Sequence, residues 1–226
     1  MTVLSQDSEP LADIVRTAYA LGKTIDISAI GYGRVHWGNQ QDVLDTPVPY
    51  YYLLAGMVRR HKLNRIFEIG THWGGATRAM YHGLEDPAAG KVVTVDITTE
   101  SDNRLHAYPD IVKIVGDGNT EPVFDKVLEA FGDEPIDVMY IDADHSAMPT
   151  LVSYSLYVAA LRPRFVVLDD VTWNDGMRKA WKYIQASVAP GDSINAFDVD
   201  PGIRPSPDRP GFGVVRVASG VGRCGR

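Results

Sequence analysis

The sequence predicts an α/β fold: a seven-stranded, mostly parallel sheet with helices on both faces and an antiparallel edge strand. Short runs rich in Val and Ile alternate with helix-forming stretches through the middle of the chain, the pattern of successive βαβ units. The 226 residues suffice for one domain with a substantial core. Hydrophobic residues make up 45% and charged residues 23%, as in ordinary globular proteins.

The individual elements follow from run length and composition. Five runs have the character of buried parallel strands: 65–69, 91–96, 111–115, 136–142 and 164–169. Helices are expected at 10–22, 48–61, 74–84, 121–131 and 147–161. Two later strand-like runs, 193–199 and 212–217, are joined by a loop with four prolines. Because such a loop cannot form a helical crossover, we expect these two runs to pair antiparallel at the sheet edge.

The chain is expected to form a single domain with three parts. Residues 1–63 form an N-terminal helical segment, whose irregular stretch 27–49 is a candidate lid. Residues 64–218 form the core, and the Gly- and Arg-rich residues 219–226 form a flexible tail.

Charge and cysteine content restrict the partners and the location. The net charge is −7 and the basic residues are not gathered in one run, which disfavours a nucleic-acid or membrane partner. Cys224 is the only cysteine, so no intrachain disulfide is possible. The N-terminus is acidic and lacks the features of a leader, and no run of 18 apolar residues occurs. We therefore expect a cytoplasmic protein.

The residues that close the predicted strands are polar and mostly acidic. In open α/β sheets, ligands bind beyond the carboxyl ends of the parallel strands, so these positions form the candidate site. They are Glu68 with Gly70, Asp96, Gly116 with Asp117, Asp142 with Asp144 and His145, and Asp169 with Asp170.

The turn after the first strand of the core indicates a nucleoside site. Gly70, Gly74 and Gly75 let the backbone pass close to a ligand, in a Gly-x-x-x-Gly-Gly spacing. This is neither the dinucleotide fingerprint nor a phosphate loop. Asp96 closes the next strand, where an acid accepts hydrogen bonds from ribose hydroxyls. Tight packing for the glycines and a helix cap for Asp96 are the structural alternatives.

These residues resemble a known superfamily. Glu68-Ile-Gly70-x-x-x-Gly74-x-x-Thr77 is similar to a signature of catechol- and caffeoyl-CoA-type O-methyltransferases, which are class I S-adenosylmethionine-dependent enzymes with a Rossmann-like fold. The segment 137–146 resembles the branch that tailors macrolides, aminocoumarins and cephalosporins. The resemblance covers about 60–180, and Ala76 departs from it where Ser is frequent.

The resemblance implies a set of cofactor contacts. Glu68 and Gly70 would contact the methionine part of S-adenosylmethionine, Asp96 the ribose, and Asp117 would lie near the adenine. The full set of candidate cofactor-binding residues is Glu68, Gly70, Thr71, Gly74, Thr77, Asp96, Asp117 and Asp142.

The ends of the fourth and fifth strands indicate a metal site. Carboxylates brought close together repel one another, so protonation or a cation must offset them. Oxygen ligands suit Mg²⁺, Mn²⁺ or Ca²⁺. The resemblance places the ligands at Asp142, Asp169 and Asp170, with Asp144 as a rival for Asp142. The alternative is that Asp169 and Asp170 cap the next helix and Asp144 faces water.

Methyl transfer to oxygen also needs a base. A divalent metal would orient two acceptor oxygens and lower the pKa of one hydroxyl. His145 is the first candidate for the base, because a neutral imidazole works near pH 7, and Asp144 is the second. The acceptor pocket is expected to include aromatic residues and one amide: His36, Trp37, Tyr50, Tyr51, Trp173 and Asn174.

The sequence therefore favours a metal-assisted O-methyltransferase of a small molecule, such as a natural-product sugar, a catechol or another vicinal diol. Two alternatives remain open: a metal-independent N- or C-methyltransferase, and a nucleoside-binding module without catalysis. The glycine spacing disfavours a dehydrogenase. The resemblance also allows a homo-oligomer.

Overall fold

The computed structural model describes residues 9–30, 32–35, 41–44, 47–99 and 101–218. Its centre is a seven-stranded sheet in the order β5-β4-β3-β6-β7-β9-β8. The strands are β3 (Arg65–Ile69), β4 (Lys91–Asp96), β5 (Ile111–Val115), β6 (Val138–Ile141), β7 (Phe165–Asp169), β8 (Ser193–Asn195) and β9 (Phe212–Arg216). The first five are parallel, whereas β9 pairs antiparallel with both β7 and β8. This confirms the predicted mostly parallel sheet with an antiparallel strand near its edge.

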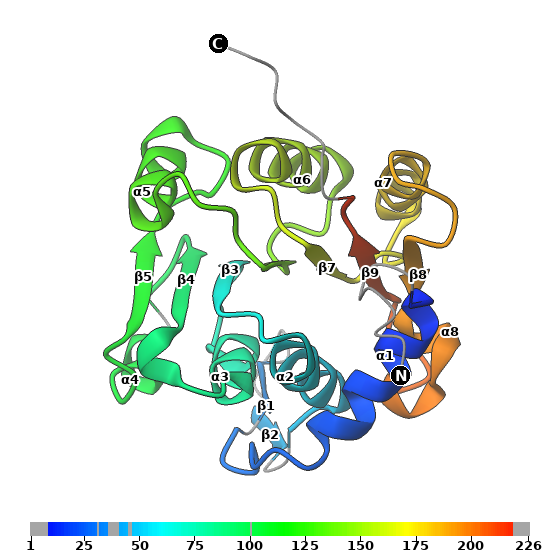
Figure 1. Cartoon of the computed structure of the whole chain (residues 1–226), viewed down its shortest axis with the longest axis horizontal. Helices are drawn as coiled ribbons and strands as arrows, with labels where there is room; N and C mark the ends of the chain where they lie inside the picture. The colour runs from blue at the N-terminus through cyan, green and yellow to red at the C-terminus, as the bar shows by residue number, and fades with distance from the viewer. Residues whose placement is uncertain (1–8, 31, 36–40, 45–46, 100, 219–226) are drawn as a thin grey trace, which may run out of the picture.

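Helices cover both faces of the sheet (Figure 1). The longer ones are α1 (Leu11–Gly22), α2 (Pro49–His61), α3 (Gly75–Gly83), α5 (Glu121–Phe131), α6 (Ala147–Leu161) and α7 (Asp175–Ala186). The shorter ones are α4 (Asp102–Leu105), α8 (Ala196–Val199) and the 3-10 turns η2 (Pro87–Ala89) and η3 (Pro201–Ile203). A separate pair of strands, β1 (Tyr32–Val35) and β2 (Gln41–Leu44), is antiparallel.

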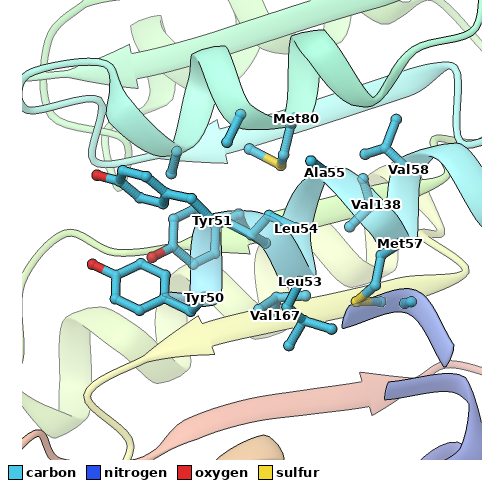
Figure 2. Close-up of a cluster of buried hydrophobic side chains, with 14 of the residues drawn as sticks. Tyr50, Tyr51, Leu53, Leu54, Ala55, Met57, Val58, Met80, Val138 and Val167 are labelled. Atoms are coloured by element: carbon cyan, nitrogen blue, oxygen red, sulfur yellow. The ribbon is translucent and has the colours of Figure 1, made fainter. Parts of the chain in front are cut away.

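Alternate strand residues feed two cores, because successive side chains of a strand point to opposite faces. In β3, Ile66 packs with α1, α2 and α3, whereas Phe67 packs with α5, α6 and α7. Figure 2 shows the first core, where Leu53 and Leu54 of α2 lie near Val138 and Val167 of the sheet. The N-terminal helices therefore share one core with the sheet.

The structure differs from the sequence prediction at several element ends. The strand-like run 193–199 divides into β8 and the helical turn α8, because the Asn195 side chain accepts a hydrogen bond from the Phe197 N–H and begins a helix. Helices α4 and α7 were not among the predicted elements. Of the candidate lid, only residues 27–30, β1, β2 and 47–49 lie among the described residues; the tail 219–226 lies outside them.

None of the helices in the described part of the chain is long and apolar enough to cross a membrane.

Candidate active site

One cavity of about 830 Å³ opens at the carboxyl ends of the parallel strands. Its volume is in the range of small-molecule sites. Its walls include the turn after β3, the ends of β4 and β6, and the loop before β9. Of the predicted site residues, those that line it are Gly70, Thr71, Asp96, Asp117, Asp142, Asp144, His145 and Asp170.

The glycine turn is shaped by backbone conformations that favour glycine. Gly70 has φ 98°, and a Cβ there would lie 1.9 Å from the Asp142 carbonyl oxygen. Gly74, at φ 72°, precedes α3 in the left-handed region. His72, also left-handed at φ 44°, donates its N–H to Asp96 Oδ2 at 2.7 Å. The turn therefore holds β3, β4 and β6 close together and leaves its outer surface open to the cavity.

Glu68 and Thr77 lie beneath this turn and not on the cavity wall. Both are fully buried, and Glu68 Oε2 accepts hydrogen bonds from the hydroxyls of Thr77 and Thr94. Burial raises the pKa of Glu68 to about 8, against the opposing effect of these hydrogen bonds. In this structure the two residues support the turn from behind. A direct contact of Glu68 with a ligand stays a prediction.

Asp96 and Asp117 stand at neighbouring strand ends. Asp96 Oδ1 accepts the Thr98 N–H at 2.8 Å, so both carboxylate oxygens are held by backbone donors. Asp117 Oδ1 accepts the Asn119 N–H at 2.9 Å. These bonds fix both carboxylates at the wall of the cavity.

Asp142, Asp169 and Asp170, here called the acid cluster, meet where β6 and β7 end. Tyr140 donates its hydroxyl to Asp142 Oδ2 at 3.1 Å. Asp169 is 2% exposed and Asp170 is 4% exposed. Burial and the nearby charge of Asp142 raise the pKa of Asp169, while Arg209 opposes the rise. The predicted convergence of these three acids is therefore present in the structure.

The cations beside the acid cluster come from the chain itself. Arg209 contacts Asp169 Oδ2 through Nη2 and lies 3.5 Å from Asp170 Oδ1 through Nε. His145 Nδ1 lies 2.9 Å from Asp170 Oδ2, and its Nε2 lies 3.4 Å from Asp142 Oδ1. Burial alone would lower the pKa of His145, but the hydrogen bonds and charges of Asp142 and Asp170 raise it to about 10.

The two candidate bases, His145 and Asp144, therefore differ in their availability to accept a proton. Both imidazole nitrogens of His145 face carboxylates, so the ring is a cation at neutral pH and has no lone pair for a substrate proton. Asp144 is exposed at the cavity wall, and its backbone carbonyl accepts the Thr150 hydroxyl at 3.0 Å.

The residues expected at the acceptor pocket differ in their placement. Tyr50 and Tyr51 line the cavity. Asn174 instead begins α7 by accepting the Met177 N–H, and it donates to the His145 carbonyl at 2.9 Å. Trp173 is 59% exposed. His36 and Trp37 lie outside the described residues.

Arg209 is the functional candidate that sequence reasoning missed. It belongs to the Pro-rich segment before β9, which carries no motif. The available signal was electrostatic: three acids at adjacent strand ends require a counter-charge, and an arginine of the same chain can supply it.

The fold and parts of the sequence are similar to known methyltransferases. Residues 67–171 match the family model described as a methyltransferase domain. No curated protein is similar enough in sequence to count as a match. An O-methyltransferase from Bacillus cereus in complex with SAH has 19% identity and a TM-score of 0.57, covering 90% of this chain and 91% of that one.

A second solved structure shows the same likeness. The O-methyltransferase TomG from Streptomyces achromogenes, involved in tomaymycin synthesis and in complex with SAM, has 20% identity and a TM-score of 0.57. The match covers 96% of this chain and 92% of that chain. Residues 67–171 are thus similar to a methyltransferase domain across the glycine turn and the acid cluster, and the chain shares its fold with these two solved O-methyltransferases.

Proposed function

We propose that this protein is a methyltransferase that uses S-adenosylmethionine to methylate a hydroxyl oxygen of a small molecule, such as a natural-product sugar, a catechol or another vicinal diol. The observation that carries the proposal is one continuous cavity. It joins the glycine turn and Asp96 to Asp142 and Asp170 of the acid cluster, and it also includes His145 and Arg209. The O-methyltransferase names of the two similar structures support oxygen as the acceptor atom.

The turn side of the cavity fits the cofactor. Gly70 and Gly75 line the cavity without side chains, and Asp96 and Asp117 offer carboxylates toward a nucleoside. S-adenosylmethionine would supply a methyl group, whose bond to the sulfonium sulfur would break as the acceptor oxygen bonds to the methyl carbon, leaving the sulfur as a neutral thioether. The protein's tasks are then to orient the acceptor and to take its proton.

The acid-cluster side fits a hydroxyl acceptor. Arg209 and the His145 imidazolium place positive charge where negative charge develops on the acceptor oxygen. Because the imidazolium already holds its protons, we propose that the exposed carboxylate of Asp144 takes the proton from the hydroxyl. His145 would act as the base only if one of its carboxylate contacts opened.

Metal assistance stays a prediction of the sequence. The side chains that would bind the metal do not fit a divalent ion in their present arrangement. The oxygens expected as ligands on Asp169 and Asp170 face Arg209 and His145. Among the residues that the structure describes, no group of three or more His, Cys, Asp or Glu side chains is arranged to hold a metal. Cytoplasmic location and homo-oligomerisation likewise remain sequence predictions.

Transfer of a labelled methyl group tests the function. The protein is incubated with S-adenosylmethionine that carries a deuterated methyl group and with a panel of catechols, sugar diols, single alcohols and amines. Mass spectrometry should detect the label on hydroxyl acceptors, above all on vicinal diols, and Asp144→Asn should lower the rate. Asp133→Asn, an exposed acid on the loop before β6, serves as the control. Transfer to amines alone would overturn the oxygen assignment.

A further inference from the structure

Arg209 reaches the acid cluster from a loop that is anchored on both sides. The loop runs from η3 to β9, and the Arg209 N–H donates to the Ser206 carbonyl at 3.1 Å. Gly211 has φ 53°, and a Cβ there would lie 2.7 Å from a Val171 methyl group, so the loop packs closely on the segment after β7. Phe212 stacks on Tyr50 with ring centroids 5.0 Å apart.

The Arg209 guanidinium also lies against the Tyr50 ring and is mostly buried. Its central carbon lies 5.7 Å from the centre of the Tyr50 ring, and Arg209 has 19% of its side chain exposed. Tyr50 comes from α2, the acid cluster from β6 and β7, and Arg209 from the loop before β9. Segments far apart in the sequence therefore hold this one side chain in place.

The four carboxylate oxygens of Asp169 and Asp170 already face donors of this chain. Arg209 faces Asp169 Oδ2 and Asp170 Oδ1, the Asp170 N–H donates to Asp169 Oδ1, and His145 faces Asp170 Oδ2. A guanidinium keeps its charge at every physiological pH, and it cannot share carboxylate oxygens with an ion without mutual repulsion. The third predicted ligand, Asp142, is occupied by Tyr140 and His145.

We propose that Arg209 is a built-in cation that takes the place of the divalent metal, so that methyl transfer by this chain is metal-independent. Arg209 lines the same cavity as Asp144, and it offers its charge to the acceptor oxygen there. The part of this inference that concerns methyl transfer to an acceptor rests on the proposed function. The part that concerns metal binding does not.

The test is a titration of Mn²⁺, followed by electron paramagnetic resonance, into protein without cofactor or acceptor. Wild type and Arg209→Lys, which both keep a cation, should show no Mn²⁺ site. Arg209→Gln, which removes the charge but keeps a polar side chain, should bind Mn²⁺ at least about tenfold more tightly than the weakest binding that the wild-type titration can detect. Adding Asp170→Asn to Arg209→Gln should abolish the gain.

The matched control is Arg204→Gln in the same loop. Arg204 lies over the Phe197 ring and bonds to the Pro207 carbonyl, away from the acid cluster, so its substitution should create no site. Mn²⁺ binding by wild type that Asp170→Asn removes would overturn the inference. So would a folded Arg209→Gln without increased Mn²⁺ affinity. If Arg209→Gln does not fold, the wild-type and Arg209→Lys titrations decide.

A second arm separates this inference from the proposed function. Binding of S-adenosylmethionine, measured by calorimetry, and any methyl transfer should be unchanged by EDTA. Loss of transfer with EDTA, restored by Mg²⁺, would overturn the metal-independent mechanism and leave the methyltransferase assignment intact. Absence of transfer to every acceptor would count against the proposed function only, because the Mn²⁺ titration does not depend on it.

Discussion

At the scale of single residues, the site depends on positions where only one residue type fits. Gly70 is the clearest case, because its positive φ and the approach of the Asp142 carbonyl both exclude a Cβ. The sequence pattern predicted that a glycine is needed at this position. It could not predict the reason, because the close approach is between the ends of β3 and β6, which are far apart in the chain.

Gly70→Ala should therefore lower the free energy of unfolding by more than about 2 kcal/mol. The matched control is Gly132→Ala, which has φ 66° and nothing within 4 Å of the added Cβ. The control should lose only the backbone strain of its positive φ, about 1–3 kcal/mol, and therefore less than Gly70→Ala, which adds a clash to the same kind of strain. Urea unfolding of both variants measures the difference. Equal losses would show that the close approach to Asp142 contributes nothing.

The protonation of His145 gives a second prediction at this scale. With its pKa raised to about 10, only about one imidazole in a thousand is neutral at pH 7. If His145 were the base, kcat would rise about tenfold per pH unit from pH 7 toward 10. With Asp144 as the base, this His145-dependent rise should be absent.

Profiles of kcat against pH, recorded for wild type, His145→Gln and Asp144→Asn with one acceptor of high hydroxyl pKa, distinguish the two roles. We expect Asp144→Asn to lower kcat at every pH by about 10²-fold or more. A steep rise in wild type that disappears only in His145→Gln would assign the base to His145.

At the scale of elements, the contact of α1 with α2 positions Tyr50 and Tyr51 at the cavity. The two helices approach through Gly22 and Gly56, and a Cβ on Gly56 would lie 1.8 Å from the Ala18 carbonyl oxygen. Glycine permits this approach because it has no side chain. The N-terminal helices are thus part of the site's support.

Gly56→Ala tests this contact, because the contact reverses the sign of the expected change in the free energy of unfolding. In an exposed helix, Gly→Ala stabilises by about 1 kcal/mol. Here we expect a loss of about 2 kcal/mol or more, because α1 must move away from α2. The thermal unfolding midpoint measures it, and an increase in the midpoint would contradict the observed helix contact.

Elements were predictable from the sequence where local pattern decides them. The β-branched runs located β3, β4 and β7 closely, because buried parallel strands are apolar on both faces. The run at β5 was also located, although this strand lies at the sheet edge and is partly exposed. The boundary between β8 and α8 depends on the Asn195 side chain, which periodicity does not reveal. Arg209 was missed because a loop residue acquires its role from what the fold brings next to it.

The candidate site was predictable to a similar degree. Acids at the ends of parallel strands were expected to meet, and Asp142, Asp169 and Asp170 do, since neighbouring strands share one edge. Glu68 was expected at the cofactor, and that contact stays a prediction. In the structure Glu68 lies behind the turn, where Thr77 and Thr94 donate hydrogen bonds to one of its oxygens.

At the scale of the whole molecule, stability should fall as the solution becomes acidic. His61 is buried beside Phe165, and burial, aided by the charges of Arg60 and Arg164, lowers its pKa to about 4. Between pH 6.5 and about 4, the unfolded chain binds a proton at this residue that the folded chain does not. Stability contributed by neutral His61 is therefore present above pH 6.5 and lost as the pH falls.

The loss attributable to His61 should reach up to about 3 kcal/mol by pH 4. His61→Gln keeps an acceptor for Arg60 but does not titrate, so its unfolding free energy should depend less on pH in this window. The exposed His106→Gln is the control and should follow wild type. Denaturant unfolding at several pH values supplies the comparison, and identical curves for His61→Gln and wild type would contradict the assignment.

Calorimetric titration of S-adenosylmethionine tests the central claim most directly. Wild type should bind one equivalent, Asp96→Ala should bind at least about tenfold more weakly because the ribose hydroxyls lose their acceptor, and Asp133→Ala should bind like wild type. Such a result places the cofactor at the carboxyl ends of β3 and β4. Absence of binding to wild type, or binding that Asp96→Ala leaves unchanged, would contradict the assigned cofactor site.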